Sequence, residues 1–328
     1  MPLMRAIVID GYGGPDVLRI DDVQQPDPGT GDIRVRVRAF GVNRADLLQR
    51  RGMYLPPADA PQNIPGLEYA GEVESVGPGA RHVARGDRVM GIVGGGGYAQ
   101  FLVTPAELTM PIPDDMSFTD AAAIPEVFVT AHDALERLVL VRGEWVLIHA
   151  VGSGVGTAAL QLAIARGAHC IGTSRTSVKL AKAAELGMEV GVNTEKEDLT
   201  DVVLRSVDRG VDAVVDLIGG PLFPKTMDVM ALRGRIVVVG LTGGSRSALD
   251  LGLLLRKRLR IEGTVLRSRS VAEKAAVMKS FREKVLPLLA QGTLRPIVDR
   301  VFDFEDVRAA HEHLESNASF GKLVVTVE

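Results

Sequence analysis

The stretch that decides the fold reads WVLIHAVGSGVGTAALQLAIARGA and covers residues 145–168. Its first four residues are a continuous apolar run, which is typical of a strand buried on both faces of a parallel sheet. A cluster of glycines follows, and apolar residues then recur at helical spacing, at Val155, Ala159 and Leu162. Gly167 is suited to end that helix. The stretch therefore predicts a strand, a tight turn and a helix, in that order.

A turn of this composition is suited to binding phosphate. Gly154 and Gly156 have no Cβ, so a backbone segment or a pyrophosphate can approach them closely. The N–H groups at the start of the helix, from Ser153 through Val155, would face the phosphates with the support of the helix dipole. The spacing differs from the usual G-x-G-x-x-G, and a glycine-rich turn without a ligand stays open as the alternative. The order of strand, turn and helix favours a dinucleotide site.

The next predicted strand, residues 169–173, indicates which dinucleotide is bound. An NAD site usually has Asp or Glu about 20 residues after the glycines, to bind the ribose 2′-hydroxyl. This sequence instead has Ser174 and Arg175, with Lys179 one turn further on. The two cations could bind the 2′-phosphate of NADPH, and each charge-assisted hydrogen bond contributes about 1.5–3 kcal/mol. One or two such bonds would give roughly a 10–1000-fold preference for NADPH over NADH. The alternative is that both are solvated surface charges.

Length, charge and cysteine content limit the classes of protein. A chain of 328 residues predicts two domains, and a net charge of −3 argues against nucleic acid as the main partner. The sequence has no apolar run of 18 residues, and from Met1 it enters strand-like sequence directly, so we expect neither a membrane span nor a signal peptide. The single cysteine, Cys170, excludes an intrachain disulfide and a cysteine-rich zinc site, and it indicates a cytoplasmic protein.

Residues 5–110 are expected to form an all-β domain, a distorted barrel of short strands. Residues 33–39 alternate between apolar and polar side chains, which predicts a strand with one buried face and one solvent-exposed face. A polar helix is expected from Asn43 to Arg50. The four consecutive glycines at 94–97 are interpreted as a flexible connector, and the alternative is a shortened loop where relatives could carry an insertion.

From Phe118 onward the pattern changes to repeated strand–helix units, which predict a parallel sheet. Its strands are expected at 145–149, 169–173, 189–192, 211–216 and 235–240. Because ligands lie beyond the carboxyl ends of such strands, Ile218, Gly219, Gly240 and Leu241 are candidate walls for the adenosine and nicotinamide.

The last part of the chain is expected to leave this sheet. The basic cluster at 256–260 is interpreted as a solvent-exposed segment before a strand at 261–265, with nucleic-acid binding as the weaker alternative. An amphipathic helix is predicted over 272–291 and another over 307–315. A strand at 322–327 after these helices indicates that the chain returns to the first domain.

Seven motifs together resemble those of the zinc-independent, zeta-crystallin-like quinone oxidoreductases of the medium-chain dehydrogenase/reductase superfamily. They are NRADL at 43–47, GMY at 52–54, PGLEYAG at 65–71, GDRV at 86–89, AAAIPE at 121–126, HAVGSGVG at 149–156 and GKLV at 321–324. The resemblance implies an α/β protein in which a GroES-like β-barrel joins a Rossmann domain with a doubly wound parallel sheet.

The same resemblance implies how the chain is divided and assembled. Residues 1–122 would form the catalytic domain, residues 123–266 the NADPH-binding domain, and residues 267–328 would return to the catalytic domain. The active site would lie in the cleft between the domains. A homodimer would form by pairing of edge strands near residues 261–266.

The resemblance also bears on metal and cofactor. Zinc-dependent relatives hold catalytic zinc with a cysteine where Asn43 stands and a histidine where Leu67 stands, so no metal is expected. Further cofactor contacts are expected at Leu266, Arg267 and Lys322, and at Thr194, which stands where some relatives have a tyrosine against the adenosine phosphate. Arg175 stands where those relatives have a small residue, so the phosphate would be held differently here.

Without zinc, hydrogen-bond donors must offset the negative charge that develops on the substrate oxygen. The candidates are Asn43, Tyr54 and Thr130, and also Arg267. A tyrosine at the position matching Tyr54 is the proton donor in related enoyl reductases, and a purely positioning hydrogen bond is the alternative. For Asp46 and for Glu68 a structural role, as a helix cap or in an ion pair, is favoured.

The function expected from these residues is NADPH-dependent reduction of a small quinone by hydride transfer. The first alternative is an NADPH-dependent 2-enal or enoyl reductase, which takes hydride at Cβ and a proton at Cα. A third alternative, from another class, is an NADPH-binding sensor or RNA-binding protein.

Overall fold

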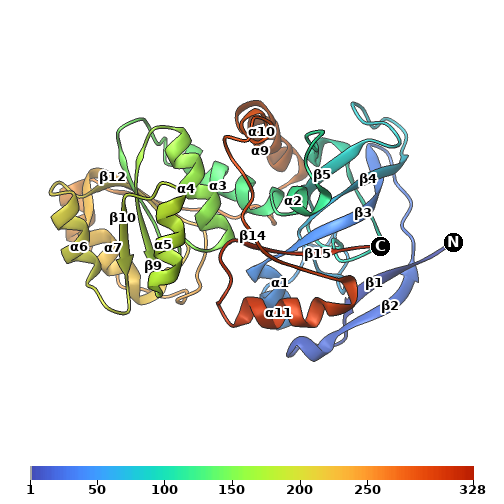
Figure 1. Cartoon of the computed structure of the whole chain (residues 1–328), viewed down its shortest axis with the longest axis horizontal. Coiled ribbons are helices and arrows are strands. Elements are labelled where there is room, and N and C mark those ends of the chain that lie inside the picture. The colour runs from blue at the N-terminus through green and yellow to red at the C-terminus, as the bar shows by residue number, and fades with distance from the viewer. Residues whose placement is uncertain (1) are drawn as a thin grey trace. The chain divides into compact units, whose positions relative to one another are not determined.

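The computed structural model describes residues 2–328, and Met1, from which the strand-like start was expected, lies outside them. The chain divides into two compact units, one that extends to Val129 and takes up Leu266–Glu328, and one formed by Thr130–Val265 (Figure 1). The chain thus passes from one unit to the other within helix α3 (Pro125–Arg137) and between Val265 and Leu266. The domain limits expected from sequence were 122/123 and 266/267.

The second unit is built on a six-stranded parallel sheet with the order β10-β9-β8-β11-β12-β13. Its strands are β8 (Trp145–Ile148), β9 (His169–Ser174), β10 (Val190–Asn193), β11 (Val211–Asp216), β12 (Met230–Val238) and β13 (Arg260–Gly263). The chain winds outward from β8 to β10 and then back to β11 and outward again, with helices on both sides of the sheet (Figure 1). This is the predicted doubly wound arrangement.

The order of the strands follows from their composition and fixes where a ligand can bind. Val146, Leu147 and Ile148 are fully buried, as expected of a strand covered on both faces. Val215 of β11 lies opposite Ile148 of β8, so the segments after these two strands leave the sheet side by side. The strand order reverses at this pair, and the crevice at such a switch point is where open α/β sheets bind ligands.

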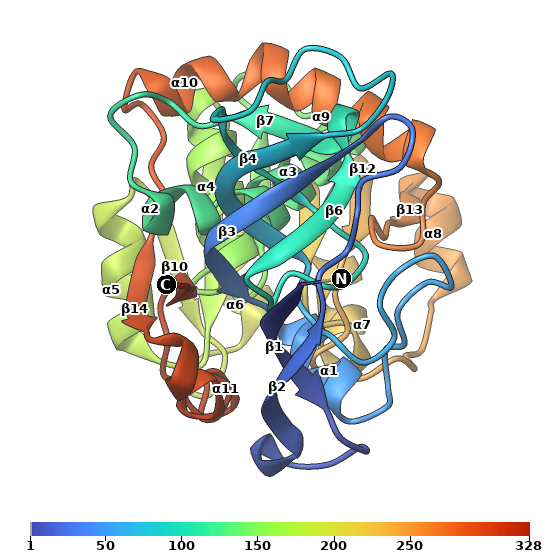
Figure 2. The same cartoon turned by 90° about the vertical axis from the view of Figure 1, so that its right-hand side faces the viewer.

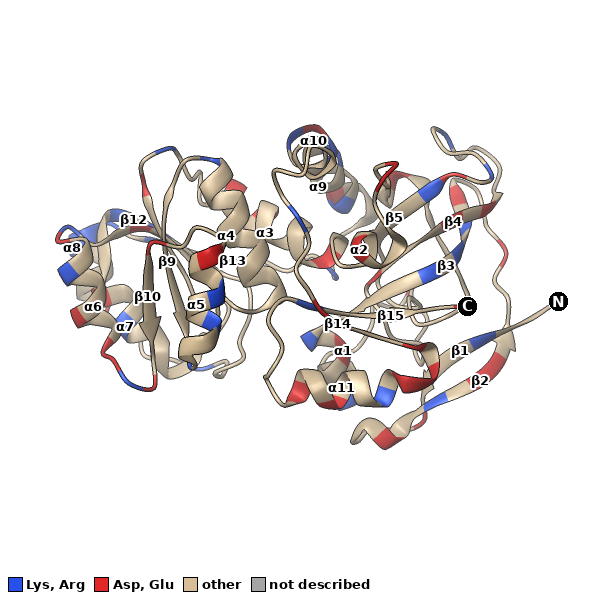
Figure 3. Ribbon diagram, viewed as in Figure 1, with Lys and Arg blue, Asp and Glu red and all other residues tan. Residues whose placement is uncertain are grey.

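The helices of this unit connect its strands. They are α4 (Gly154–Ala165), α5 (Ser177–Glu185), α6 (Leu199–Ser206), α7 (Phe223–Asp228) and α8 (Leu251–Lys257). The basic cluster at 256–260 ends α8 and leads into β13. Arg256, Arg258 and Arg260 are exposed there, as expected of a wet stretch. Acidic and basic residues are interspersed over the ribbon of each unit (Figure 3).

The first unit is built on a seven-stranded sheet with the order β14-β15-β3-β4-β5-β7, in which β6 also pairs with β3, and on the separate hairpin β1-β2. The strands are β1 (Leu3–Ile9), β2 (Leu18–Gln24), β3 (Asp32–Val42), β4 (Glu68–Val76), β5 (Arg88–Ile92), β6 (Phe101–Pro105), β7 (Thr109–Pro111), β14 (Val298–Phe302) and β15 (Lys322–Thr326). Figure 2 shows β3 lying between β4 and β6. Burial alternates along the first half of β3, so the predicted period-two strand is confirmed.

The end of the chain returns to this unit, as predicted. Strand β15 pairs antiparallel with β3, with Val324 opposite Gly41. The helix predicted over 272–291 is in fact two helices, α9 (Val271–Lys284) and α10 (Leu286–Ala290). The break falls beside Pro287, which has no N–H for the ladder and whose ring would clash with the carbonyl four residues earlier. The helix predicted over 307–315 is α11 (Val307–Glu315).

The interpretation of the glycine tract as a flexible connector is wrong. Residues 95–97 are buried, and the amides of Gly96 and Gly97 donate to the carbonyl groups of Ile64 and Gly66. A Cβ on Gly97 would lie 3.0 Å from the Glu68 carbonyl oxygen. The glycines are required because a neighbouring segment packs directly on their backbone, an effect that composition alone does not reveal.

No helix in residues 2–328 has both the length and the apolar character that crossing a bilayer requires.

Candidate active site

The predicted strand, turn and helix of the second unit are present at β8 and α4. The chain leaves β8 at Ile148 and turns through Ala150, whose φ of 47° is in the left-handed region. Helix α4 begins at Gly154, and its N-cap is Ser153, whose Oγ accepts a hydrogen bond from the Gly156 amide at 3.1 Å. The amides of Gly154 and Val155 are the first two of the helix and have no carbonyl partner within it. They are the donors that an anion would meet at this end of α4.

Gly156 is required by the protein's own backbone. A Cβ at this position would overlap the Ala150 carbonyl oxygen and would lie 2.7 Å from the Val151 carbonyl oxygen. The close backbone approach considered from sequence is therefore present at residue 156. The glycine lets the turn fold directly onto the first turn of α4.

The residues expected to select the dinucleotide gather at the carboxyl ends of β9 and β10. Ser174 is buried, and its carbonyl oxygen accepts from the Thr194 amide at 3.0 Å, which brings these two predicted residues together. Arg175 is exposed and Lys179 is half-buried on α5. No Asp or Glu occurs between Ser174 and Lys182. The carboxylate typical of an NAD site is therefore absent from this stretch.

The predicted walls lie at the ends of β11 and β12. Asp216 closes β11, and its Oδ1 accepts from the Ile218 amide at 2.8 Å and from the Gly219 amide at 2.9 Å. The Gly240 amide donates to the Asp216 carbonyl oxygen, and a Cβ on Gly219 would lie 2.8 Å from the Leu241 side chain. Asp216 thus binds the backbone amides of Ile218, Gly219 and Gly240. Sequence reasoning assigned it no role, although a carboxylate at the end of a buried strand was the available signal.

His149, just before the turn, links β9 to α7 through two side-chain contacts. Its Nδ1 lies 3.1 Å from Thr173 Oγ1 and its Nε2 lies 2.8 Å from Thr226 Oγ1. Because Thr226 Oγ1 donates to the Leu222 carbonyl, it accepts from His149 Nε2–H. Burial lowers the pKa of His149 to about 4, against the opposing effect of Asp216. The ring is therefore a neutral, packed strand-end residue, as expected.

The first unit contains a buried polar cluster, which we define as Asn43, Asp46, Glu68, Tyr98, His311 and Lys322. At its centre the Lys322 ammonium donates to Glu68 Oε1 at 2.5 Å, to Asn43 Oδ1 at 2.7 Å and to the Val42 carbonyl at 3.1 Å. Asn43 Nδ2 also donates to Glu68 Oε1, at 2.8 Å. Lys322, expected to contact the cofactor, is 4% exposed and has its ammonium directed into this cluster.

A chain of hydrogen bonds continues the cluster from Asp46 to Arg50. Asp46 Oδ2 accepts from the Asn43 amide at 2.7 Å, as the capping box of helix α1 (Arg44–Arg50), and from Tyr98 Oη at 3.0 Å. Tyr98 Oη in turn lies 3.1 Å from His311 Nε2, and Arg50 Nη1 lies 3.4 Å from His311 Nδ1. Burial raises the pKa of Asp46 to about 6, while burial and the charge of Arg50 lower the pKa of His311 to about 3. The favoured structural roles of Asp46 as a cap and of Glu68 in an ion pair agree with these contacts.

This arrangement leaves no vacant donor set for a metal at Asn43 and Glu68. Both side-chain oxygens that point to the centre are already bound by the Lys322 ammonium, and the neighbouring Leu67 is a buried apolar residue. Within residues 2–328, no group of three or more His, Cys, Asp or Glu side chains is positioned to hold a metal ion.

Arg267 holds the loop that carries Tyr54. Its Nε donates to the Gly94 carbonyl at 2.8 Å, its Nη1 to the Tyr54 carbonyl at 3.0 Å and its Nη2 to Gln49 Oε1 at 2.5 Å. Its guanidinium carbon lies 4.9 Å from the centre of the Tyr54 ring. Leu266, which precedes it, is buried. The structure thus gives Arg267 a positioning contact with Tyr54 that sequence reasoning did not anticipate.

Tyr54 itself is half-buried and keeps its proton at neutral pH. Burial and the nearby charge of Glu126 raise the pKa of the Tyr54 phenol, and Arg267 acts in the opposite direction. Tyr54, Asn43 and Arg267 all belong to the first unit, whereas Thr130 on α3 is the first residue of the second.

Glu126 is the acidic neighbour that sequence reasoning missed. It lies in the first turn of α3, and its amide donates to Glu68 Oε2 at 2.8 Å. Burial and the charge of Glu68 raise the pKa of the Glu126 carboxyl to about 8. The sequence contained it within the AAAIPE motif, but nothing in that motif indicates which charges surround it.

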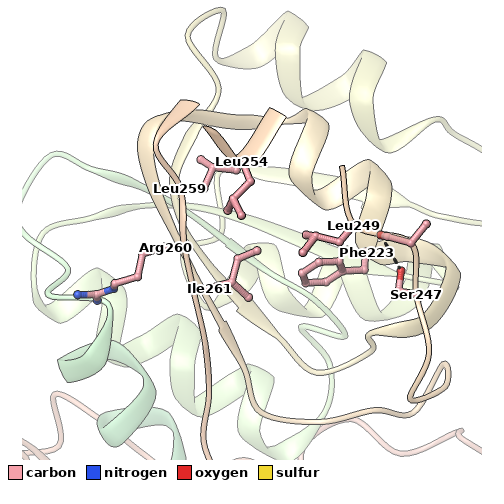
Figure 4. Close-up of a pocket in the computed structure, with 8 residues that line it drawn as sticks. Phe223, Ser247, Leu249, Leu254, Leu259, Arg260 and Ile261 are labelled. Carbon is pink, nitrogen blue, oxygen red and sulfur yellow. Dashed lines mark hydrogen bonds between the residues drawn. The ribbon is translucent and has the colours of Figure 1, made fainter. Parts of the chain in front are cut away.

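A separate apolar depression lies at the edge strand of the second unit. Phe223, Leu249, Leu254, Leu259 and Ile261 line it, with Ser247 and Arg260 at its border (Figure 4). Its lining comes from α7, α8, β13 and the segment before α8, not from the turn after β8.

Comparison with known proteins identifies the family to which this chain belongs. A family model described as zinc-binding dehydrogenase matches residues 154–283, and one described as alcohol dehydrogenase GroES-like domain matches residues 29–114. The synaptic vesicle membrane protein VAT-1 homolog-like of Mus musculus is 31% identical, covering 99% of this chain and 82% of that protein. The quinone oxidoreductase of Rattus norvegicus is 30% identical, covering 98% of each.

A solved structure gives the same result. The Escherichia coli quinone oxidoreductase complexed with NADPH is 29% identical, with a TM-score of 0.89 over 98% of this chain and 100% of that one. The chain therefore belongs to the medium-chain dehydrogenase/reductase superfamily and is a quinone oxidoreductase-like protein. The expected fold, a GroES-like domain with a Rossmann-like parallel sheet, is confirmed.

Proposed function

We propose that this member of the superfamily reduces small quinones by hydride transfer from NADPH, without a metal ion. The observation that carries the metal-free part is the Lys322 ammonium, which binds Asn43 Oδ1 and Glu68 Oε1. These are the oxygens that a cation at this place would need, and an ammonium ion already binds both and balances the charge of Glu68.

NADPH, when bound, supplies the hydride. The residues of the second unit fit such a group. The Gly154 and Val155 amides would hold the pyrophosphate at the start of α4. Ser174, Arg175 and Lys179 would hold the 2′-phosphate, since no carboxylate in that stretch repels it.

The remaining predicted contacts would enclose the rest of the cofactor. We assign Thr194, Ile218, Gly240 and Leu241 to its walls, because the loops that carry them converge at the carboxyl ends of the strands. Arg267 and Lys322 are assigned instead to positioning in the first unit, because the nitrogens of both donate to protein oxygens.

The proton in this proposal comes from Tyr54. A phenol whose pKa is raised stays protonated and can donate to an oxyanion that forms on the acceptor. Asn43 would act indirectly, because its amide group is engaged by Glu68 and Lys322. The Thr130 hydroxyl remains a candidate donor to the same oxyanion.

The second candidate function is reduction of a 2-enal or enoyl substrate. Tyr54 favours it specifically, since reduction of such a substrate requires a proton at Cα after hydride addition at Cβ. Oxidation of NADPH and NADH by the purified chain, followed by absorbance with a panel of quinones and enals, distinguishes the two. We expect turnover with quinones and a preference for NADPH. Turnover with enals alone would favour the second candidate, and NADPH binding without any acceptor would favour a sensor or RNA-binding role.

We also propose a homodimer formed through β13 and a cytoplasmic location. Strand β13 is at the edge of its sheet, and Leu251 and Leu255 on the adjacent α8 are exposed. Light scattering on the purified chain tests the dimer. The location is supported by the single, buried Cys170, which suits a reducing compartment.

A further inference from the structure

The turn after β8 depends on one residue in an unfavourable backbone conformation. Ala150 has a φ of 47°, in the left-handed region that residues with a Cβ rarely adopt. Its carbonyl oxygen accepts from the amide of Ser153, the N-cap of α4, at 2.9 Å. The conformation of Ala150 therefore sets where α4 begins, and with it the positions of the Gly154 and Val155 amides. A residue in such a conformation persists only where its surroundings hold it there.

Thr173 holds Ala150 from the neighbouring strand β9. Thr173 Oγ1 accepts from the Ala150 amide at 3.3 Å, and the Thr173 carbonyl accepts from the Val151 amide at 2.9 Å. Thr173 is fully buried, so bulk water does not compete for its hydroxyl. Both backbone polar groups of Ala150 are thus bound, the amide by Thr173 and the carbonyl by Ser153.

A second chain of contacts fixes the direction in which the Thr173 hydroxyl points. Thr226 Oγ1 donates its only proton to the Leu222 carbonyl at 3.1 Å, so it accepts from His149 Nε2–H at 2.8 Å. Burial lowers the pKa of His149 to about 4, so the ring is neutral at neutral pH and its Nδ1 is an acceptor. Thr173 Oγ1, 3.1 Å away, donates to this nitrogen. Because its proton is bound there, the Thr173 oxygen presents a lone pair to the Ala150 amide.

We propose that Thr173 is a positioning residue for the phosphates of the dinucleotide, oriented by His149 and acting through Ala150. The inference rests on the proposed function, since it takes the turn after β8 as the cofactor site. The Thr173 hydroxyl holds the Ala150 amide, and Ala150 places the first amides of α4 before any ligand binds. Binding then requires no rearrangement of the turn, so the phosphate contacts are not weakened by the cost of ordering it.

The first test compares two substitutions at residue 173. Thr173→Val keeps the branched shape of the side chain and removes the hydroxyl, whereas Thr173→Ser keeps the hydroxyl. The Kd for NADPH, titrated through nicotinamide fluorescence, should rise about tenfold in Thr173→Val, as expected for the loss of one neutral hydrogen bond. In Thr173→Ser it should stay within about twofold of the wild type, because the hydrogen bond is kept. With a quinone that the wild type reduces, kcat at saturating NADPH should change less than Kd.

Thr109→Val is the matched control. Thr109 is also a buried threonine, and its Oγ1 donates one hydrogen bond, to the Ala106 carbonyl at 2.8 Å. Both residues of this bond belong to the first unit. The substitution therefore removes a buried hydroxyl of the same kind, and the Kd for NADPH should keep its wild-type value.

The second test needs neither cofactor nor turnover. The chain has six histidines, so the ring-nitrogen NMR signals of His149 can be assigned by their loss in His149→Gln. In the wild type at neutral pH these signals should show a proton on Nε2 and none on Nδ1. Exchange of the Ala150 amide with deuterium should be about tenfold faster in Thr173→Val than in the wild type, and unchanged in Thr173→Ser.

The outcomes separate the positioning role from the proposed function. A proton on His149 Nδ1 overturns the orientation of the Thr173 hydroxyl. An unchanged Ala150 exchange rate in Thr173→Val, or a Kd that rises equally in Thr173→Val and Thr109→Val, overturns the positioning role even when NADPH binds. A wild-type chain that binds neither NADPH nor NADH overturns the proposed function, and the role toward the cofactor with it.

A further variant keeps the test valid if Thr173→Val does not fold, as judged by its thermal midpoint. Thr226→Val removes the acceptor of His149 Nε2–H, so the ring no longer holds the Thr173 hydroxyl in one direction. Ala150 exchange and the Kd for NADPH should then both increase, by less than is expected for Thr173→Val. Wild-type values of both in a folded Thr226→Val would overturn the proposed chain of contacts.

Discussion

Replacing Gly156 with alanine tests whether backbone packing, and not ligand approach, requires the glycine after β8. The new Cβ would overlap the Ala150 carbonyl oxygen and lie 2.7 Å and 2.8 Å from the oxygen and carbon of the Val151 carbonyl. These are main-chain atoms, and Ala150 is already held at a positive φ, so neither neighbour can rotate away as a side chain would. Overpacking of this kind costs about 1–3 kcal/mol, and we expect the upper end of that range.

The assay is urea unfolding of the chain without cofactor. Gly156→Ala should lower the free energy of unfolding by about 2–3 kcal/mol, with an unchanged dependence on urea concentration. Gly263→Ala is the matched control, because a Cβ there meets no atom within 4 Å and its φ is not in the left-handed region. The NADPH dissociation constant of Gly156→Ala should also rise, since moving the turn moves the amides of Gly154 and Val155. If Gly156→Ala unfolds within 0.5 kcal/mol of the wild type, as surface substitutions usually do, the packing argument is refuted.

Three further predictions follow from the same structure. Arg175→Ala with Lys179→Ala should raise KM for NADPH roughly 10–1000-fold and leave KM for NADH unchanged, and an unchanged ratio of the two would exclude their role. Lys322→Met should lower the free energy of unfolding in urea by about 3–5 kcal/mol, because it leaves the buried Glu68 carboxylate without its ion-pair partner. Adding Glu68→Gln to this variant should recover part of the lost free energy. If the two substitutions instead gave additive losses, the pairing would be contradicted. His149 has a pKa of about 4 in the folded chain and stays neutral above that pH, whereas in the unfolded chain it takes up a proton below about pH 6.5. The free energy of unfolding should therefore fall as the pH is lowered from 6.5 to 4. His149→Gln should make this fall smaller, and an identical pH dependence would exclude the assignment.

The strand, turn and helix after Trp145 were predictable because their signals are local. An apolar run, a glycine cluster and apolar residues at helical spacing each act over a few residues, and tertiary contacts agree with them here. The break at Pro287 is equally local, and the prediction of one helix over 272–291 failed because the amphipathic pattern was followed through the proline.

The glycine tract shows where local reasoning stops. Four consecutive glycines are typical of a flexible segment, since they carry no side chains that could bury surface. In this chain the small size serves the opposite purpose, because residues 61–68 pack onto the bare backbone. That contact depends on how β4 and the preceding loop lie, which composition cannot supply.

The buried polar cluster was also beyond prediction from residue types alone. Lys322 and Asn43 are 279 positions apart, and their contact arises only because β15 returns to pair with β3. Sequence reasoning recognised that return but assigned Lys322 to the cofactor from the family resemblance. The ion pair with Glu68 could not be inferred, because a lysine at the start of a strand is ordinarily solvent-facing.

The charge of Lys322 also affects the protonation of the Glu126 carboxyl. The Lys322 ammonium balances one carboxylate, that of Glu68. Ionising a second carboxyl nearby is then unfavourable, because that charge would be buried beside Glu68. A divalent cation in the same place would stabilise a second negative charge and remove the reason for Glu126 to keep its proton. Removing the charge through Lys322→Met in a Glu68→Gln background should therefore leave Glu126 without either neighbour's charge. Because Glu68 has the larger effect of the two, the midpoint of the Glu126 titration, followed by the NMR signal of its carboxyl carbon, should then move below about 8. A midpoint that does not move would show that burial alone governs the pKa of Glu126.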